Sequence, residues 1–216
     1  MIYNNATAVS VSDFLLKIKA IKLNNSDPFT WASGMRSPIY CDNRVTLSYP
    51  EVRTHIRDEF VKAIRSQFED VDVIAGVATG AIAQGALVAE ALGLPFVYIR
   101  SESKKHGLEN LIEGHVEAGQ KVVVVEDLIS TGGSSLKAVN ALRTAKCEVK
   151  GMVAIFSYQL PVAAENFEKE KCKLITLADY DTMVKQAAEN KYIMESDMAS
   201  LNEWRKDPKK WAAKFI

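Results

Sequence analysis

Five short, largely apolar segments alternate with helix-like segments through the middle of this chain, and this alternation restricts the fold more than any other feature. The apolar segments are Val71–Val77, Pro95–Ile99, Lys121–Val125, Met152–Phe156 and Leu174–Leu177. They show no polar alternation, so both faces of each strand are expected to be buried, as in parallel strands covered by helices. The helix-like segments between them are Ala81–Leu92, Ser134–Ala145 and Pro161–Lys169. This order predicts an α/β fold with a doubly wound, mostly parallel sheet flanked by helices.

The segments on either side of this alternation are expected to be mainly helical. A first helix is predicted over Ser12–Leu23, with Ser12 as its N-cap. A second helix is predicted from Ser48-Tyr49-Pro50-Glu51, where Ser48 suits the N-cap and Pro50 the first turn. The tail after residue 179 is expected to form short helices. The chain therefore reads as one domain, with an N-terminal helix and hood (about 1–48), an α/β core (about 49–178) and C-terminal helices (about 179–216).

Charge and composition exclude several classes of function. Lys and Arg number 27 and Asp and Glu number 27, so the formal net charge is zero and no overall basic field attracts nucleic acid or a membrane. There is no run of about 18 apolar residues and no secretory signal. The three cysteines are far apart and odd in number, which favours a cytoplasmic location, and the scattered histidines argue against a zinc hydrolase.

The stretch Val122–Ser135 carries the most chemistry. An apolar strand leads into the acids Glu126 and Asp127, then a turn rich in Ser, Thr and Gly, and then a helix. Gly132 and Gly133 let the backbone approach a ligand, and the N–H groups of this turn meet the positive end of the helix dipole. With hydroxyls from Thr131, Ser134 and Ser135, this is a cradle for a phosphate monoester, while the acids can accept hydrogen bonds from sugar hydroxyls. The pattern predicts a site for ribose 5-phosphate.

The alternative for this stretch is purely structural, with the acids capping a helix and the glycines making a tight turn. Two adjacent acids followed by five small residues exceed what a cap needs, so the functional reading is preferred. Two other phosphate motifs do not fit, since no Lys follows the last Gly as in a Walker loop and the GxGxxG spacing is absent.

A second feature is the long connection Arg100–Gly114, which is well beyond the usual length between strand and helix and suggests a lid. Arg100, Lys104, Lys105 and His106 form a local positive cluster. Such a cluster, with a metal ion, suits a pyrophosphate leaving group; the alternative is a solvated basic loop.

Two further segments leave functional and structural readings open. The turn Val77–Ala81 can bind a second anion by its main-chain N–H groups or be an ordinary turn between strand and helix. The aromatic-rich segment Phe29–Arg44 can cover a flat ring, with Tyr40 or Trp31 stacking and Arg36 or Arg44 pairing a carboxylate, or it can be a β-ribbon packed on the core.

Taken together, these motifs resemble a known family. Val122–Ser135 resembles the phosphoribosyl pyrophosphate motif of type I phosphoribosyltransferases. Phe29–Tyr40 (F-T-x-x-S-G-x-x-S-P-x-Y) and Arg100–Gly107 (R-x-x-x-K-x-H-G) resemble the orotate phosphoribosyltransferases in particular. The resemblance implies the type I phosphoribosyltransferase fold and the transfer of ribose 5-phosphate from phosphoribosyl pyrophosphate to orotate. The products would be orotidine 5′-monophosphate and pyrophosphate, in pyrimidine biosynthesis with Mg²⁺.

The resemblance also assigns roles to individual residues. It implies a homodimer in which Arg100, Lys104 and His106 of one subunit meet the pyrophosphate in the neighbour's site. Glu126 and Asp127 would hold the ribose hydroxyls. The remaining substrate-binding positions would be Leu128, Ile129, Ser130, Thr131, Gly132, Gly133 and Ser134, with Ser130 also close to the orotate, and Tyr40 and Arg44. No protein residue is expected to be a metal ligand.

The sequence departs from the better-known family pattern at the orotate site. Ala32 and Ser101 each replace a common Lys, and a Lys is also missing from the turn at Ala78-Thr79-Gly80. Tyr158 stands where an Arg often binds the orotate carboxylate, and Arg44 is the predicted substitute. Two alternatives remain: a phosphoribosyltransferase for a purine base, and a non-catalytic regulator that senses phosphoribosyl pyrophosphate.

Overall fold

A six-stranded sheet organises the computed structural model, which describes residues 1–31, 34–101 and 111–215. The strand order is β10-β9-β8-β5-β6-β7, and all neighbours are parallel except β6 and β7. The strands are β5 (Val73–Val77), β6 (Phe96–Ile99), β7 (Ile112–Glu113), β8 (Lys121–Ile129), β9 (Glu148–Ser157) and β10 (Leu174–Asp179). The chain winds outward in both directions from the β5–β8 pair, which confirms the predicted doubly wound sheet.

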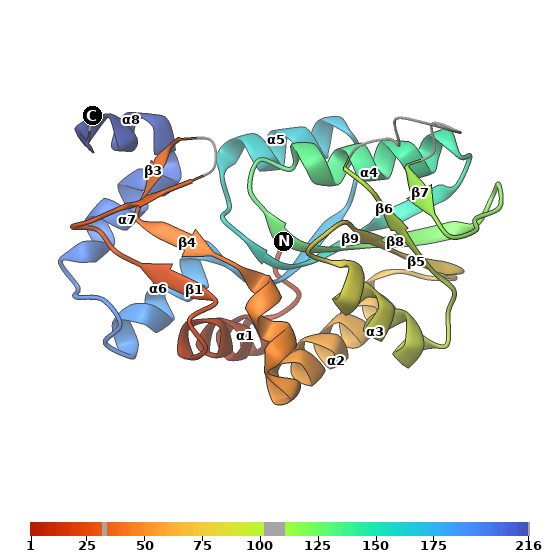
Figure 1. Ribbon diagram of the computed structural model, residues 1–216, viewed down its shortest axis with the longest axis horizontal. Coiled ribbons are helices and arrows are strands. Elements are labelled where there is room, and N and C mark those ends of the chain that lie inside the picture. The colour runs from red at the N-terminus through yellow and green to blue at the C-terminus, as the bar shows by residue number, and fades with distance from the viewer. Residues whose placement is uncertain (32–33, 102–110, 216) are drawn as a thin grey trace.

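Helices cover both faces of this sheet (Figure 1). On one side lie α1 (Asn5–Lys17), α2 (Pro50–Gln67) and α3 (Ile82–Leu92). On the other lie α4 (Gly133–Thr144) and α5 (Pro161–Lys169). Along β8 the valines alternate between the two cores, because Val123 and Val125 pack toward α1–α3 while Val122 and Val124 pack toward α4 and α5. Both faces are buried, as the apolar strands require.

A small hood and a C-terminal group of helices lie beside the sheet, at the left of Figure 1. The hood consists of two short antiparallel pairs and a 3-10 helix: β1 (Ile21–Leu23) with β4 (Ile39–Cys41), β2 (Phe29–Thr30) with β3 (Arg36–Ser37), and η1 (Asn43–Ser48). The C-terminal elements are α6 (Tyr180–Glu189), α7 (Asp197–Lys206), α8 (Pro208–Ala212) and η2 (Ala213–Phe215). Trp204 and Trp211 are fully buried, so this tail completes the core. No helix in the described residues is long and apolar enough to cross a membrane.

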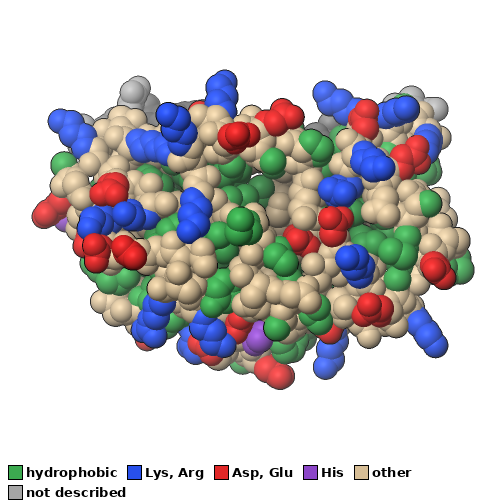
Figure 2. All heavy atoms as spheres, turned by 180° about the vertical axis from the view of Figure 1, so that it is seen from behind, with side chains coloured by type: hydrophobic (Ala, Val, Ile, Leu, Met, Phe, Trp, Pro, Cys, Tyr) green, Lys and Arg blue, Asp and Glu red, His purple; other side chains and the backbone are tan. Residues whose placement is uncertain are grey.

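Charged side chains of both signs are mixed over the rear face of the molecule, and Figure 2 shows no extended patch of one sign there. This distribution agrees with the zero net charge of the sequence.

The N-terminal helix differs from the prediction. It begins at Asn5, not at Ser12, and Asn4 is its N-cap, with Oδ1 accepting from Thr7 N at 2.8 Å. Ser12 is buried in mid-helix, and residues 21–23 form strand β1. The prediction was wrong because Ser12 was read as a cap, although it lies on the face that packs against the core.

The second helix starts where expected, but its predicted cap was wrong. Ser48 ends η1, Tyr49 occupies the N-cap position without a side-chain hydrogen bond, and Pro50 is the first helical residue. Other differences concern strands. β8, β9 and β10 are longer than predicted, and β8 runs on to Ile129 because it pairs with β9 as far as Ser157.

The connection after Arg100 also contains the short strand β7.

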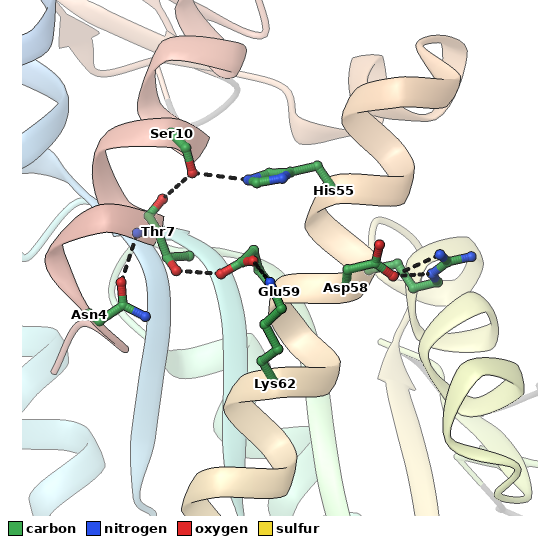
Figure 3. A network of polar contacts seen from close by, with 8 residues as sticks. Asn4, Thr7, Ser10, His55, Asp58, Glu59 and Lys62 are labelled. Carbon is green, nitrogen blue, oxygen red and sulfur yellow. Dashed lines mark hydrogen bonds and ion pairs between the residues drawn. The ribbon is translucent and has the colours of Figure 1, made fainter.

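A polar seam joins α1 to α2, as Figure 3 shows. Thr7 Oγ1 donates to the buried Glu59 carboxylate, which also accepts from Lys62 Nζ at 2.6 Å. One turn along, Ser10 Oγ lies 3.0 Å from His55 Nε2. This seam fixes α1, and with it the start of the hood, against the core.

The caps give a direct test of how the chain enters these helices. Replacing Asn4 with Ala removes the acceptor for Thr7 N and should lower the free energy of unfolding by about 1 kcal/mol. Ser48→Ala, at an exposed position that caps nothing, should change it by less than about 0.5 kcal/mol. Urea unfolding of both variants measures the difference, and equal losses would contradict this assignment of the caps.

Candidate active site

The two adjacent acids of the predicted ribose site lie on β8 and point in different directions. Successive side chains of a strand alternate between faces, so Glu126 follows Val122 and Val124 toward α4. There it is buried, with Ser135 Oγ donating to Oε2 at 2.7 Å and Asp127 N donating to Oε1 at 2.9 Å. Burial, together with the neighbouring Asp127 charge, raises the pKa of Glu126 well above its usual range.

Asp127 is the accessible acid of the pair. Its side chain is half-buried and lies against the turn that follows β5, where a Cβ added at Gly80 would overlap the Asp127 carboxylate. Only glycine at position 80 therefore lets the turn of residues 78–80 approach Asp127 this closely. Because β5 and β8 are the strands at which the winding reverses, this is the point where α/β sheets bind ligands.

The predicted phosphate loop forms the connection from β8 to α4. Gly132 is in the left-handed region at φ 80°, and a Cβ there would lie 2.7 Å from Phe167 Cε2, so both backbone and packing require glycine. Asn166 Nδ2 donates to Thr131 O at 2.9 Å and holds the loop from α5. Gly133 and Ser134 are exposed in the first turn of α4, whose N–H groups have no partners within the helix. The loop therefore offers main-chain donors at a helix N-terminus, as a phosphate requires.

Two positions in this stretch have structural surroundings. The Ser135 hydroxyl, predicted to bind phosphate, is buried and donates to Glu126, so this geometry does not favour that role. Ile129 is fully buried in the core beneath α4, and its carbonyl accepts from Tyr158 N at 3.0 Å. Side-chain contact with a substrate is therefore not expected from Ile129.

Arg100 lies at the end of β6, on the opposite side of the Ala78–Gly80 turn from the phosphate loop. It lines a cavity of about 520 Å³ together with Ala78, Thr79 and Ser101, among others, and its Nη1 lies 3.4 Å from Glu113 Oε1. In this cavity the turn Val77–Ala81, predicted as a second anion site, lies next to Arg100, the first positive residue of the predicted lid. Lys104 and His106, the other two lid residues, lie outside the described residues.

The hood covers a smaller cavity of about 240 Å³ beside the phosphate loop. Its lining comprises Thr30, Trp31, Tyr40, Cys41, Leu128, Ser130 and Tyr158. Tyr40, Leu128 and Ser130 were all predicted from the sequence as substrate-binding positions, and the fold brings them together. Trp31 lies on one wall, with its ring stacked on Tyr158 at 5.3 Å between centroids. The cavity is largely aromatic and lies beside the predicted sugar-phosphate site, with Leu128 and Ser130 in its lining.

Arg44 has different surroundings from those predicted. Its guanidinium is paired with Asp42, with Nε to Oδ1 at 2.7 Å and Nη2 to Oδ2 at 2.9 Å. Arg44 is not among the residues that line the hood cavity. A carboxylate contact from Arg44 would require this bidentate pair to break, so this geometry does not favour it.

Sequence reasoning did not single out Asn43, which is buried and joins the hood to β8. Its Nδ2 donates to Asp127 O at 2.5 Å, and its Oδ1 accepts from Cys41 Sγ at 3.4 Å. The one feature of the sequence that pointed to Asn43 was its position directly after Tyr40-Cys41-Asp42, in the segment predicted to cover a ring. Asn43 fixes the main chain of the accessible acid relative to the hood cavity.

Comparison with known proteins agrees with this geometry. Residues 47–192 match the family model described as the phosphoribosyl transferase domain. An orotate phosphoribosyltransferase of Bacteroides thetaiotaomicron is 62% identical over 199 residues, which are 92% of this chain and 94% of the relative. The chain belongs to the orotate phosphoribosyltransferase family. A relative of the same name from Listeria monocytogenes is 51% identical over 201 residues, covering 93% of this chain and 96% of the relative.

Solved structures agree on the fold. The orotate phosphoribosyltransferase of Aeropyrum pernix superposes with a TM-score of 0.74 at 27% identity, covering 83% of this chain and 98% of that one. An adenine phosphoribosyltransferase from Leishmania donovani has a TM-score of 0.62 at 23% identity over 80% of this chain and 81% of that one, which is a likeness of fold alone. The expected phosphoribosyltransferase fold is confirmed.

The raised pKa of Glu126 predicts a pH-dependent stability. Above about pH 4.3 the unfolded chain loses this proton while the folded chain retains it, so this group's contribution to stability falls as pH rises toward its folded pKa. Glu126→Gln does not titrate, and its amide can still meet both Ser135 and Asp127 N. The stability of Glu126→Gln relative to the parent should therefore increase between pH 5 and pH 8, measured by urea unfolding.

The control for this experiment is Glu90→Gln, which removes an exposed carboxylate from α3. A difference between Glu126→Gln and the parent that stays constant across this range would contradict the raised pKa.

Proposed function

We propose that this chain transfers ribose 5-phosphate from phosphoribosyl pyrophosphate to orotate, giving orotidine 5′-monophosphate and pyrophosphate. It is a phosphoribosyltransferase, and hence a glycosyltransferase of pyrimidine biosynthesis. The observation that carries this proposal is the convergence at one sheet edge of an accessible acid, a helix N-terminal loop and a largely aromatic cavity. These three features correspond to the ribose, the phosphate and the base.

The phosphoribosyl group is bound by main-chain donors and by Asp127. The N–H groups of residues 131–134 bind the 5′-phosphate at the start of α4, with the exposed hydroxyls of Thr131 and Ser134. Asp127 accepts hydrogen bonds from the ribose hydroxyls. Both Glu126 oxygens already accept hydrogen bonds within the protein, so Glu126 contributes by holding the start of α4 in register with Asp127.

The residues present also fit Mg²⁺ bound together with the substrate. The described residues contain no group of three or more His, Cys, Asp or Glu side chains that could hold a metal. Mg²⁺ is commonly held mainly by substrate phosphate oxygens and water, and the Asp127 carboxylate beside the Ala78–Gly80 turn would place negative charge near an ion held in that way, without Asp127 being a ligand itself. When bound, the ion neutralises charge on the pyrophosphate.

The protein acts by positioning and by electrostatics. As the bond from C1′ to pyrophosphate breaks, positive charge develops on the ribose ring and negative charge on the leaving group. The loop and Asp127 hold the ribose in line with the base, which lowers the entropic part of the barrier. The lid cations Arg100, Lys104 and His106, contributed by the partner subunit, stabilise the departing charge.

A turnover assay tests the reaction. Protein, Mg²⁺, phosphoribosyl pyrophosphate and orotate should consume orotate, followed by its absorbance, while adenine, guanine and uracil should not react. Lys104→Ala should lower turnover by about 10²–10³-fold, as does loss of one donor to a developing anion. Turnover of a purine would support the purine alternative, and binding of phosphoribosyl pyrophosphate without turnover of any base would support the regulator.

We also propose a homodimer in the cytoplasm, in which the lid of each subunit serves the partner's site. Cys41, Cys147 and Cys172 are free thiols, which suits a reducing compartment. The shared lid is implied by the resemblance of Arg100–Gly107 to the family pattern.

Subunit mixing tests the shared lid. Lys104→Ala and Asp127→Asn proteins should each be nearly inactive, but their heterodimers should recover activity because one of the two sites combines intact residues from both chains. Subunit exchange is verified by native mass spectrometry of differently tagged chains. Heterodimers without recovered activity would show that each lid closes over its own subunit.

A further inference from the structure

The hood cavity contains no cationic side chain among its described lining residues, although orotate carries a carboxylate. Burying a charge without a partner is costly, so a cavity that binds this anion must supply hydrogen-bond donors in place of a cation. The lining offers neutral hydroxyl groups, including those of Thr30, Ser130 and Tyr158.

Tyr158 is the most rigidly held of these donors. Its backbone N–H donates to Ile129 O at 3.0 Å, immediately after β9. Its ring stacks on Trp31 with centroids 5.3 Å apart and an interplanar angle of 25°, and it meets Trp204 edge-on at 5.6 Å. Trp204 also meets Trp31 edge-on at 5.8 Å. The three rings therefore fix one another, and the phenol cannot move without disturbing both tryptophans.

The Tyr158 hydroxyl is a donor without a protein acceptor. Tyr158 is only 3% exposed and lines the hood cavity, and within the described part of the chain no residue makes a hydrogen bond to its hydroxyl. The oxygen is not among the fully buried polar atoms that lack a partner, so it is accessible from the cavity. By contrast, the buried Tyr180 donates to Leu201 O at 2.9 Å. The Tyr158 hydroxyl is therefore available for a ligand. Burial raises the pKa of Tyr158 well above its usual value, which keeps the proton on the oxygen.

Thr30 supplies a second oriented donor at the same cavity. Its Oγ1 accepts from Arg36 Nη1 at 3.0 Å, which leaves its own hydrogen to point elsewhere. The positive charge of Arg36 therefore lies one hydrogen bond behind the lining, on the hood side. Arg36 is also paired with Asp27, Nη2 to Oδ1 at 3.6 Å, so what reaches the cavity is the oriented Thr30 hydroxyl and not a free positive charge.

We propose that Tyr158 is the residue that selects the base, donating a hydrogen bond from its hydroxyl to the carboxylate of orotate while Trp31 and Trp204 hold its ring. The inference rests on the proposed function and adds to it the group that distinguishes orotate from uracil. Trp204 acts through Tyr158 and Trp31 and is a positioning residue, contributed by the C-terminal helix α7.

Tyr158→Phe tests the proposal because it removes one oxygen and keeps the stacked ring. The KM for orotate should rise about 10- to 100-fold, as expected for a lost hydrogen bond to a charged group, while the KM for phosphoribosyl pyrophosphate stays unchanged. Tyr192→Phe is the control, since it removes a hydroxyl from an exposed tyrosine that does not line the cavity and should leave both constants unchanged.

A binding measurement shows whether Tyr158→Phe loses recognition of the carboxylate or only loosens the packing of the cavity. Calorimetry with orotidine 5′-monophosphate and uridine 5′-monophosphate, which lacks the carboxylate, gives a ratio of affinities. The parent should prefer orotidine 5′-monophosphate, and Tyr158→Phe should lose about 10- to 100-fold of that preference. Trp204→Phe should lose part of it, whereas Trp211→Phe, whose ring contacts Phe215 in the same tail, should lose none.

The outcomes distinguish this inference from the proposed function. If the parent turns over orotate but Tyr158→Phe keeps its KM for orotate and its preference between nucleotides, the role of Tyr158 is wrong. A raised KM for orotate in Arg44→Gln would then assign the carboxylate to Arg44. A parent that binds both nucleotides but turns over no orotate would contradict the proposed function instead.

Discussion

The alternation of side chains along β8 determines how the rest of the site is built. Consecutive residues of a strand face opposite sides of a sheet, so two adjacent acids cannot share one environment there. Glu126 faces α4, is buried and bonds to Ser135, while Asp127 stays accessible beside Gly80. One acid therefore couples the strand to the helix that carries the phosphate loop, and the other is left for the ligand. Burial removes water from the Glu126 carboxyl, and its hydrogen bonds within the protein replace that hydration. These bonds hold Asp127 on β8 at a fixed distance from the proposed phosphate loop at the start of α4.

The hood depends on a second fixed relation. Its strands are very short and would not hold a geometry by themselves. Asn43 ties it to Asp127 O, and the seam of Thr7 with Glu59 fixes the helix that leads into it. The rings of Trp31, Tyr158 and Trp204 join the hood to β9 and α7. The base cavity is therefore held from three elements far apart in sequence.

The sequence predicted the sheet well because each buried strand is apolar on both faces, a pattern that survives without tertiary information. Its failures have one cause in common. Ser12 and Ser48 have the right chemistry for caps, but burial and the preceding 3-10 helix, which are tertiary features, decide their roles. Ser135 also depends on tertiary structure. It belongs to the predicted phosphate motif, but its hydroxyl faces the protein interior and donates to Glu126. Tyr40, Leu128 and Ser130 could be predicted because each lies within a sequence motif, whereas Trp204 reaches the cavity only through packing on Trp31 and Tyr158.

The residues proposed for the sugar phosphate and those proposed for the base lie in different parts of the chain. The family model spans residues 47–192, which include the acids, the phosphate loop and the turn at Gly80. Thr30, Trp31, Tyr40 and Cys41 lie outside it, as does Trp204, and these residues form or support much of the base cavity. In the proposed reaction the residues for the ribose phosphate therefore lie within the matched region, while the cavity proposed for the base is completed by segments from both ends of the chain. Aromatic packing between these two ends, with Tyr158 of the core in contact with both Trp31 and Trp204, holds that cavity in shape.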